Sequence, residues 1–292
     1  YAMAAKPKTQ ADLDKMSVAL TRLGEEDPSL SISRDPVTAE TIIRGLGDVH
    51  VEIGIERVER KFGVALETSL PRIAYMETIG GSARVEYRHK KQSGGHGQFG
   101  HVVIELNPLT RGDGFEFNSK VVGGNVPREY IPAVEKGVVK SMEEGPVAGF
   151  PVVDVSVTLV DGSSHSVDSS GMAFEIAGGF ALRQGIPLAR PVLLEPVMHL
   201  RIMTPDDLTG DVISDLNTKR AQILGMTPAA NGHTIIESDV PLAMVQRYAT
   251  DLRAISAGRA SFESTFVRYG EVPQQEMDKV VQQYKKEEAV AT

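Results

Sequence analysis

Apolar residues recur at steps of three and four positions near the start of the chain. This spacing predicts an amphipathic helix with Thr9 as its N-cap and Asp27-Pro28 at its end. The apolar positions of this helix are Leu13, Met16, Ala19, Leu20 and Leu23.

The rest of the first segment alternates short strands with one more helix. A helix is expected over residues 48–62, where it stops at Gly63. Together the expected elements follow the order β-α-β-β-α-β, the ferredoxin-like split motif. The expected strands cover residues 3–5, 30–33, 41–44 and 64–67.

The same order of elements returns late in the chain. Helices are expected over residues 205–220 and 243–255, and Asn231-Gly232 is a strong turn signal between two strands. Two modules of one topology therefore flank a middle segment, and a charged helix is expected at the end. The strands of the second module are expected at residues 197–203, 222–227, 234–240 and 260–267.

The middle segment reads as a mixed α/β domain with helices on one sheet. The fold class is therefore α+β, with domains at residues 1–75, 76–196 and 197–271 and a C-terminal helix at 272–292. The expected elements of the middle domain are strands at 83–88, 101–106, 114–122 and 152–160 and helices at 130–144 and 172–184.

Composition limits the kinds of site that the chain can form. The chain has 292 residues, of which 41% are hydrophobic and 24% charged, and it contains no cysteine. Disulfides, thiolate metal sites and a cysteine nucleophile are thus excluded, and a reducing cytosol fits. The net charge of −8 means that any RNA contact must come from a local basic patch. No apolar run is long enough to suggest a membrane span.

A glycine-rich run covers residues 94–100 and matches G-x-G-x-x-G from Gly95. A Rossmann fingerprint would be followed by a helix, but residues 101–106 are expected to form a strand. A kinase glycine loop would need V-A-I-K, H-R-D and D-F-G motifs, and the sequence has none of them. Two interpretations stay open: a mobile hairpin tip, or a loop whose bare backbone approaches a partner closely.

Cations gather on both sides of this loop, and Glu86 is the one acidic residue among them. They form the local basic patch that phosphate contact would need, although a solvated charge run is the alternative interpretation. The basic residues are Arg84, Arg88, His89, Lys90, Lys91, His96 and His101.

His165 stands among serines and aspartates, which suggests a catalytic triad. The sequence contains no G-x-S-x-G elbow, so the simpler interpretation is that Asp168 or Ser169 caps the next helix and His165 is an exposed loop residue. No G-x-x-x-x-G-K-[ST] or H-E-x-x-H motif occurs, and we expect the chain itself to bind neither nucleotide nor metal.

Several strings spread in order along the chain are similar to one family. The chain resembles domains III, IV and V of elongation factor G, the bacterial counterpart of eukaryotic elongation factor 2. The strings that carry the resemblance lie at residues 7–9, 25–28, 45–53, 92–101, 121–124, 127–134, 149–154, 167–170, 210–212, 220–226 and 248–253.

The resemblance implies a middle domain similar to ribosomal protein S5 in fold, whose tip loops contact the codon–anticodon duplex and the displaced tRNA. It places Gln92, Ser93, Gly94, Gly95 and His96 in one tip loop and His165 in the other. The basic patch next to these loops comprises Arg84, Arg88, Lys90 and Lys91. At the C-terminal module, the candidates for contacts to ribosomal RNA are Arg220, Arg253 and Arg259.

The resemblance also implies the partners. The ribosome would be contacted through its RNA, the mRNA–tRNA duplex and ribosomal proteins, and a GTPase domain outside this chain would hold GTP and Mg²⁺. The implied function is GTP-dependent translocation of tRNA and mRNA by a cytoplasmic protein, expected to be a monomer without a membrane partner.

Three positions depart from the family's common pattern, which usually has Arg at Met76, Arg at His96 and Glu at Gly171. These departures raise an alternative, a specialised paralogue with weak translocation activity. A ribosomal protection factor of the same architecture and a stand-alone RNA-binding module are further alternatives.

Overall fold

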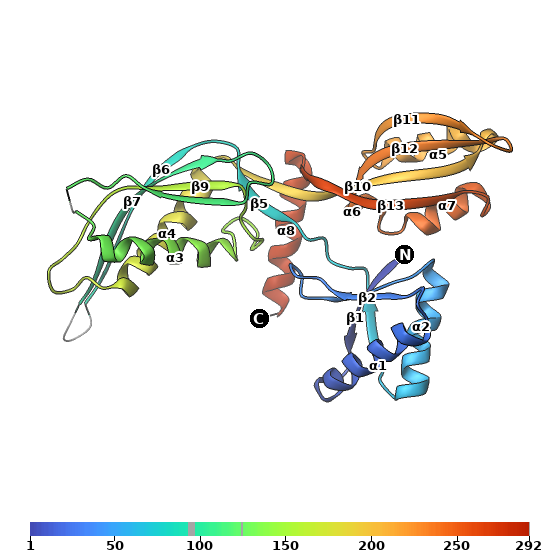
Figure 1. The fold of residues 1–292 in the computed structure, drawn as a ribbon, viewed down its shortest axis with the longest axis horizontal. Coiled ribbons are helices and arrows are strands. Elements are labelled where there is room, and N and C mark those ends of the chain that lie inside the picture. Colours follow the sequence, from blue (N-terminus) through green and yellow to red (C-terminus); the bar gives the residue numbers. More distant parts are fainter. Residues whose placement is uncertain (93–96, 124, 292) are drawn as a thin grey trace. The chain divides into compact units, whose positions relative to one another are not determined.

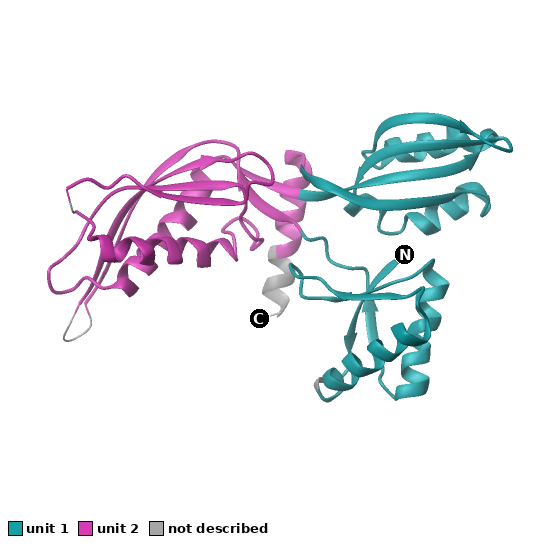
Figure 2. Ribbon diagram, in the orientation of Figure 1, with its two compact units in different colours: residues 1–74, 195–270 teal, residues 75–194, 271–292 magenta. Residues whose placement is uncertain are grey.

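The computed structural model describes residues 1–92, 97–123 and 125–291 and divides into two compact units (Figure 1, Figure 2). Unit 1 comprises residues 1–74 and 195–270, and unit 2 comprises residues 75–194 and 271–292. Both units combine helices with sheets, which confirms the predicted α+β class. Within the described ranges, every helix is too short or too polar to cross a bilayer.

The first module of unit 1 has the predicted β-α-β-β-α-β order, with the sheet order β2-β3-β1-β4. The prediction of Thr9 as N-cap is wrong. A 3₁₀ turn, η1 (Gln10–Asp12), comes first, and the Thr9 hydroxyl donates to Asp12 Oδ2 at 2.6 Å, so the α-helix begins one turn later. The elements are β1 (Ala2–Pro7), α1 (Leu13–Glu26), β2 (Ser31–Arg34), β3 (Thr41–Arg44), α2 (Asp48–Phe62) and β4 (Leu66–Ser69).

The second module of unit 1 repeats this topology, with the sheet order β11-β12-β10-β13. Asn231 and Gly232 form its predicted turn, with φ angles of 62° and 69°. The single helix expected over residues 243–255 is two helices, because Arg247 leaves helical geometry at φ −108° and ψ 17°. The elements are β10 (Pro191–Pro205), η3 (Asp206–Leu208), α5 (Thr209–Thr218), β11 (Gln222–Ala229), β12 (His233–Pro241), α6 (Leu242–Val245), α7 (Tyr248–Ser256) and β13 (Ser261–Glu271).

Unit 2 is built on a four-stranded sheet of order β6-β7-β9-β8, in which β8 runs parallel to β9 and the other pairs are antiparallel. Two helices, α3 and α4, cover one face of this sheet (Figure 1). The elements are β5 (Met76–Ile79), β6 (Ala83–Lys91), β7 (Gln98–Pro108), β8 (Phe115–Ser119), η2 (Arg128–Tyr130), α3 (Ile131–Met142), β9 (Val155–Ser163), α4 (Gly171–Leu188) and α8 (Gln274–Ala291).

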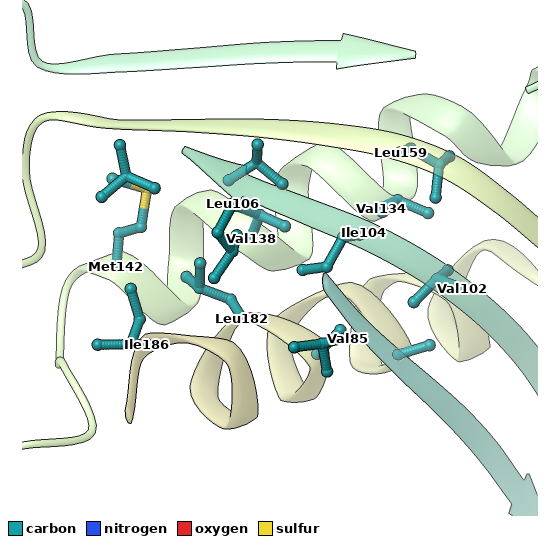
Figure 3. Packing of buried hydrophobic residues seen from close by; sticks show 14 of the residues in the cluster. Val85, Val102, Ile104, Leu106, Val134, Val138, Met142, Leu159, Leu182 and Ile186 are labelled. Atoms are coloured by element: carbon teal, nitrogen blue, oxygen red, sulfur yellow. The ribbon is translucent and has the colours of Figure 1, made fainter. Parts of the chain in front are cut away.

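The core of unit 2 lies between this sheet and its two helices. Figure 3 shows aliphatic side chains from β6, β7, α3, β9 and α4 meeting there. The two helices pack unusually close, because a Cβ atom at Gly137 would lie 1.8 Å from the carbonyl oxygen of Glu175. Only glycine permits that approach, so α3 and α4 form a rigid support for the sheet.

A buried carboxylate holds the connection between α3 and β9. Glu77 on β5 is 1% exposed, and it accepts N–H groups from Val147 (3.1 Å), Ala148 (2.7 Å) and Phe150 (3.2 Å). Burial raises the pKa of the Glu77 carboxyl, although the amide hydrogen bonds oppose this shift. Strand β5 was not among the expected elements, because it is defined by pairing with residues 191–194, far along the chain.

Candidate nucleic-acid interface at the distal end of unit 2

Two loops meet where β6 ends and α4 begins, and we call this region the distal end. It comprises the end of β6 with Gln92, Gly97 with the first β7 residues up to Phe99, and the connection from His165 to Ser170. Gln92 is exposed. Of the predicted loop residues, Ser93, Gly94, Gly95 and His96 lie outside the described residues.

Asp168 and Ser169 join the two loops through hydrogen bonds. The N–H of Phe99 donates to the carbonyl oxygen of Asp168 at 2.8 Å, and the N–H of Gly97 donates to Asp168 Oδ1 at 3.0 Å. The hydroxyl of Ser169 donates to the carbonyl oxygen of Phe99 at 3.0 Å. The structure thus brings together two segments that the sequence placed in separate loops.

His165 is exposed, with 53% of its side chain accessible, and its ring is held by the backbone. Its Nδ1 atom accepts N–H groups from Val167 (3.3 Å) and Asp168 (3.2 Å). In the neutral ring the proton therefore resides on Nε2, so the exposed ring presents an N–H donor there. Asp168 Oδ2 lies 3.4 Å from Nδ1.

The prediction that Asp168 or Ser169 caps α4 is wrong. Ser170 is the N-cap, and its hydroxyl oxygen accepts the N–H of Ala173 at 3.2 Å. Asp168 and Ser169 are thereby available for the neighbouring loop. The triad interpretation also lacks its geometry, because His165 Nδ1 is occupied by amides and Ser169 donates to a carbonyl oxygen.

The four residues of the predicted basic patch do not share one face of β6. Val85 and Tyr87 pack toward the helices, so strand alternation places Arg84, Arg88 and Lys90 on the open face and Lys91 on the helix-covered side. All four are exposed.

Acidic neighbours partly balance the patch. Arg84 lies 3.5 Å from Glu105, and Arg88 lies 3.6 Å from Glu86. His101, another of the basic residues near the loop, is mostly buried and bridges strands: its Nε2 lies 2.9 Å from Glu86 Oε1 and its Nδ1 lies 2.8 Å from the Ser163 hydroxyl. His101 is therefore held against the sheet and does not project freely toward a partner.

The three arginines singled out in the C-terminal module each have a carboxylate partner. Arg220 forms a bidentate pair with Glu195, which is 2% exposed, at 2.8 and 3.0 Å. Arg253 pairs with Asp48 at 3.1 Å, and Arg259 pairs with Asp207 at 3.2 Å. Contact of these arginines with ribosomal RNA stays a prediction.

A Ser-His-Asp cluster that the sequence did not suggest lies in the first module. His50 Nε2 lies 3.1 Å from Asp27 Oδ2 and 3.3 Å from the Ser29 hydroxyl, while His50 Nδ1 accepts the N–H of Leu46. The hydrogen bonds from Ser29 and His50 lower the pKa of Asp27 to about 2. Because the proton on Nε2 points at Asp27, His50 is no general base for Ser29, and the cluster holds a turn.

In the part of the chain that the structure describes, no group of three metal-ligating side chains occurs.

Sequence reasoning missed Gly97, Asp168 and Ser169 as a set. A glycine directly before a strand and an Asp-Ser-Ser run with more capping residues than one helix needs are the signals that could have found them.

Comparison with known proteins matches residues 1–190 and 192–280 to three domains of one family, in order along the chain. Family models match in sequence: "Elongation Factor G, domain III" over residues 1–70, "Elongation factor G, domain IV" over residues 71–190, and "Elongation factor G C-terminus" over residues 192–280. A crystal structure of a protein from Thermus thermophilus is similar over 98% of this chain, with 36% identity and a TM-score of 0.84. The chain spans 42% of the length of that protein.

Proposed function

Because this chain belongs to the elongation factor G family, we propose that it is the part of a translation elongation factor that reaches into the ribosome and promotes GTP-dependent translocation of tRNA and mRNA. The observation that carries the proposal is the distal end of unit 2, where two polar loops are held together and His165 stays exposed.

The chemistry of the distal end suits double-helical RNA. A-form RNA offers a wide, shallow minor groove with ribose hydroxyls, which small polar groups and backbone can approach. His165 offers an Nε2–H donor there, and Gln92 offers an amide that both donates and accepts. This end is suited to recognising the shape of a codon–anticodon duplex, without reading individual bases.

Positive charge near the distal end supports phosphate contact. The chain carries a net charge of −8, so attraction to RNA must be local. Lys90 and Lys91 are exposed at the end of β6, next to Gln92. When this end of unit 2 approaches an RNA duplex, these two lysines come close to the phosphates.

The proposal assigns nucleotide chemistry to a domain outside this chain, where GTP and Mg²⁺ would bind. The chain itself would act without a cofactor. Its partners would be ribosomal RNA, the mRNA–tRNA duplex, ribosomal proteins and that GTPase domain, in the cytoplasm and as a monomer.

The test is single-turnover translocation by the full-length protein that contains this chain. We expect His165→Ala to slow translocation at least about tenfold, roughly 1.4 kcal/mol of barrier, while GTP hydrolysis on ribosomes is unchanged. The matched control is His233→Ala, a histidine at the start of β12 in the C-terminal module, which should leave both rates within about twofold of wild type. Equal translocation rates for His165→Ala and wild type would refute the assignment of His165.

The substitutions relative to the family pattern favour a second candidate, a specialised paralogue. Gly171 stands at the first position of α4, where an acidic residue would complement the helix dipole, and Met76 lies beside the buried Glu77. If the wild-type protein hydrolyses GTP on ribosomes but does not translocate, the paralogue is the better description. Release of a ribosome-bound antibiotic would instead indicate a protection factor, and RNA binding without any GTPase partner a stand-alone module.

A further inference from the structure

Asp168 and Ser169 are half-buried, and they touch both loops of the distal end. We propose that they are positioning residues, which hold His165 and the start of β7 together as one unit. The inference rests on the proposed function for its role in translocation, but its structural part can be tested without the ribosome.

Asp168 holds the start of β7 with its main chain and its side chain. Its carbonyl oxygen accepts the N–H of Phe99, and its carboxylate accepts the N–H of Gly97. A Cβ atom at residue 97 would lie 3.0 Å from Asp168 Cγ, so the backbone comes this close because residue 97 is glycine. The two hydrogen bonds fix the position and the direction of the backbone as it enters β7.

Ser169 connects the same strand to His165. Its hydroxyl oxygen accepts the N–H of His165 at 2.8 Å and its hydroxyl proton goes to the carbonyl oxygen of Phe99 at 3.0 Å. The ring centroids of Phe99 and His165 lie 6.1 Å apart. One hydroxyl group therefore sets the distance between His165 and the first strand residues of the other loop.

Neither residue is needed to cap α4, because Ser170 does so. Asp168 and Ser169 therefore each bond across to the other loop, and Ser169 also bonds His165 within its own loop. As a consequence, His165 cannot shift relative to Phe99 without breaking the Ser169 bridge, and an RNA duplex that contacts both loops meets them at one separation.

The structural part is tested by amide hydrogen exchange in the full-length protein. We expect Asp168→Ala to speed exchange at Gly97, and Ser169→Ala to speed it at His165, each by about tenfold. Asp168→Asn keeps an acceptor oxygen and should stay within about threefold of wild type at Gly97.

Ser170→Ala is the matched control, because it removes the neighbouring hydroxyl, whose bond goes to Ala173 on the same helix. It should speed exchange at Ala173 and leave Gly97 and His165 unchanged. Wild-type exchange rates at Gly97 in Asp168→Ala, or at His165 in Ser169→Ala, would overturn the positioning role.

The functional part is tested by a double-mutant cycle on translocation. If Ser169 acts through His165, Ser169→Ala slows the wild-type protein but adds no further slowing to His165→Ala. If the double variant is instead slowed by the product of the two single effects, the inference that Ser169 acts through His165 is overturned. If the wild-type protein does not translocate at all, the proposed function fails, and the exchange rates alone then decide whether the two residues hold the loops together.

Discussion

Two carboxylates in unit 2 accept backbone N–H groups from a loop far along the chain, but they do so in different surroundings. Glu77 is 1% exposed and takes three N–H groups from the α3–β9 connection. Asp168 keeps 26% of its side chain exposed and takes one N–H group from Gly97. The same carboxylate–amide hydrogen bond is therefore shielded from water at Glu77 and accessible to water at Asp168.

This difference in exposure predicts different roles for the two carboxylates, one in the free energy of unfolding and the other in the geometry of the loops. Where water is excluded, an N–H group that loses its acceptor stays unsatisfied, and the full desolvation cost appears in the free energy of unfolding. Where water can enter, it replaces the lost acceptor, and what is lost is a defined geometry. Glu77 should therefore matter for whether unit 2 folds, and Asp168 for where its loops lie.

The largest expected effect comes from Glu77→Ala. It removes a buried carboxylate and leaves three N–H groups of a partly buried connection without their acceptor, so we expect the free energy of unfolding to fall by about 3 kcal/mol. Urea denaturation measures this loss, and Glu116→Ala on the exposed side of β8 is the control that should stay within about 0.5 kcal/mol. A loss below about 1 kcal/mol would mean that the connection rearranges and satisfies its own amides.

A smaller effect is expected from the titration of Glu77. Burial raises its pKa in the folded protein above the ordinary value of 4.5, so between these two values the folded state binds the proton more tightly than the unfolded chain does. The contribution of Glu77 to stability is thus fully present below pH 4.5 and declines as pH rises through the raised pKa.

Glu77→Gln has no such titration and serves as the reference. The stability of wild type minus that of Glu77→Gln, taken from urea denaturation at a series of pH values, should fall as pH rises from 4.5. A difference that increases over this range would show that the amide hydrogen bonds outweigh burial at Glu77.

The smallest expected effect on stability comes from Asp168→Ala. Its carboxylate is partly exposed and bonds one amide, so we expect the free energy of unfolding to change by less than about 1 kcal/mol. The same urea denaturation measures it. A loss as large as that of Glu77→Ala would remove the contrast between the two carboxylates and make Asp168 part of the core.

Much of the fold follows from local signals. Helix α2 has the predicted bounds, because Gly63 at its end adopts a left-handed φ of 66° that favours glycine. The repeated β-α-β-β-α-β order was visible in the alternation of short strands with amphipathic helices. Strand β5 was not, since its four residues are defined by pairing with residues 191–194 of β10.

The candidate site was predictable in its loops but not in its connections. His165 and Gln92 stand out by residue type, and both are exposed. Asp168, Ser169 and Ser170 all have capping side chains, and which of them caps α4 depends on Phe99 and Gly97, whose nearness the local sequence does not show. Strand alternation likewise divides the basic patch between two faces, which a count of cations along the chain cannot reveal.

The long separation in sequence between each carboxylate and its amides has a kinetic consequence. Glu77 and Asp168 bond to amides 70 to 73 positions away, whereas Lys136 on α3 meets Glu175 on α4 across 39 positions. Closing the longer loops costs more chain entropy. The hydrogen bonds that offset this cost form only after the intervening strands have paired in register. We therefore expect helix pairing to lead during refolding and both carboxylates to find their amides late. The distal loops would then acquire their functional geometry among the last steps, after the scaffold that supports them has formed.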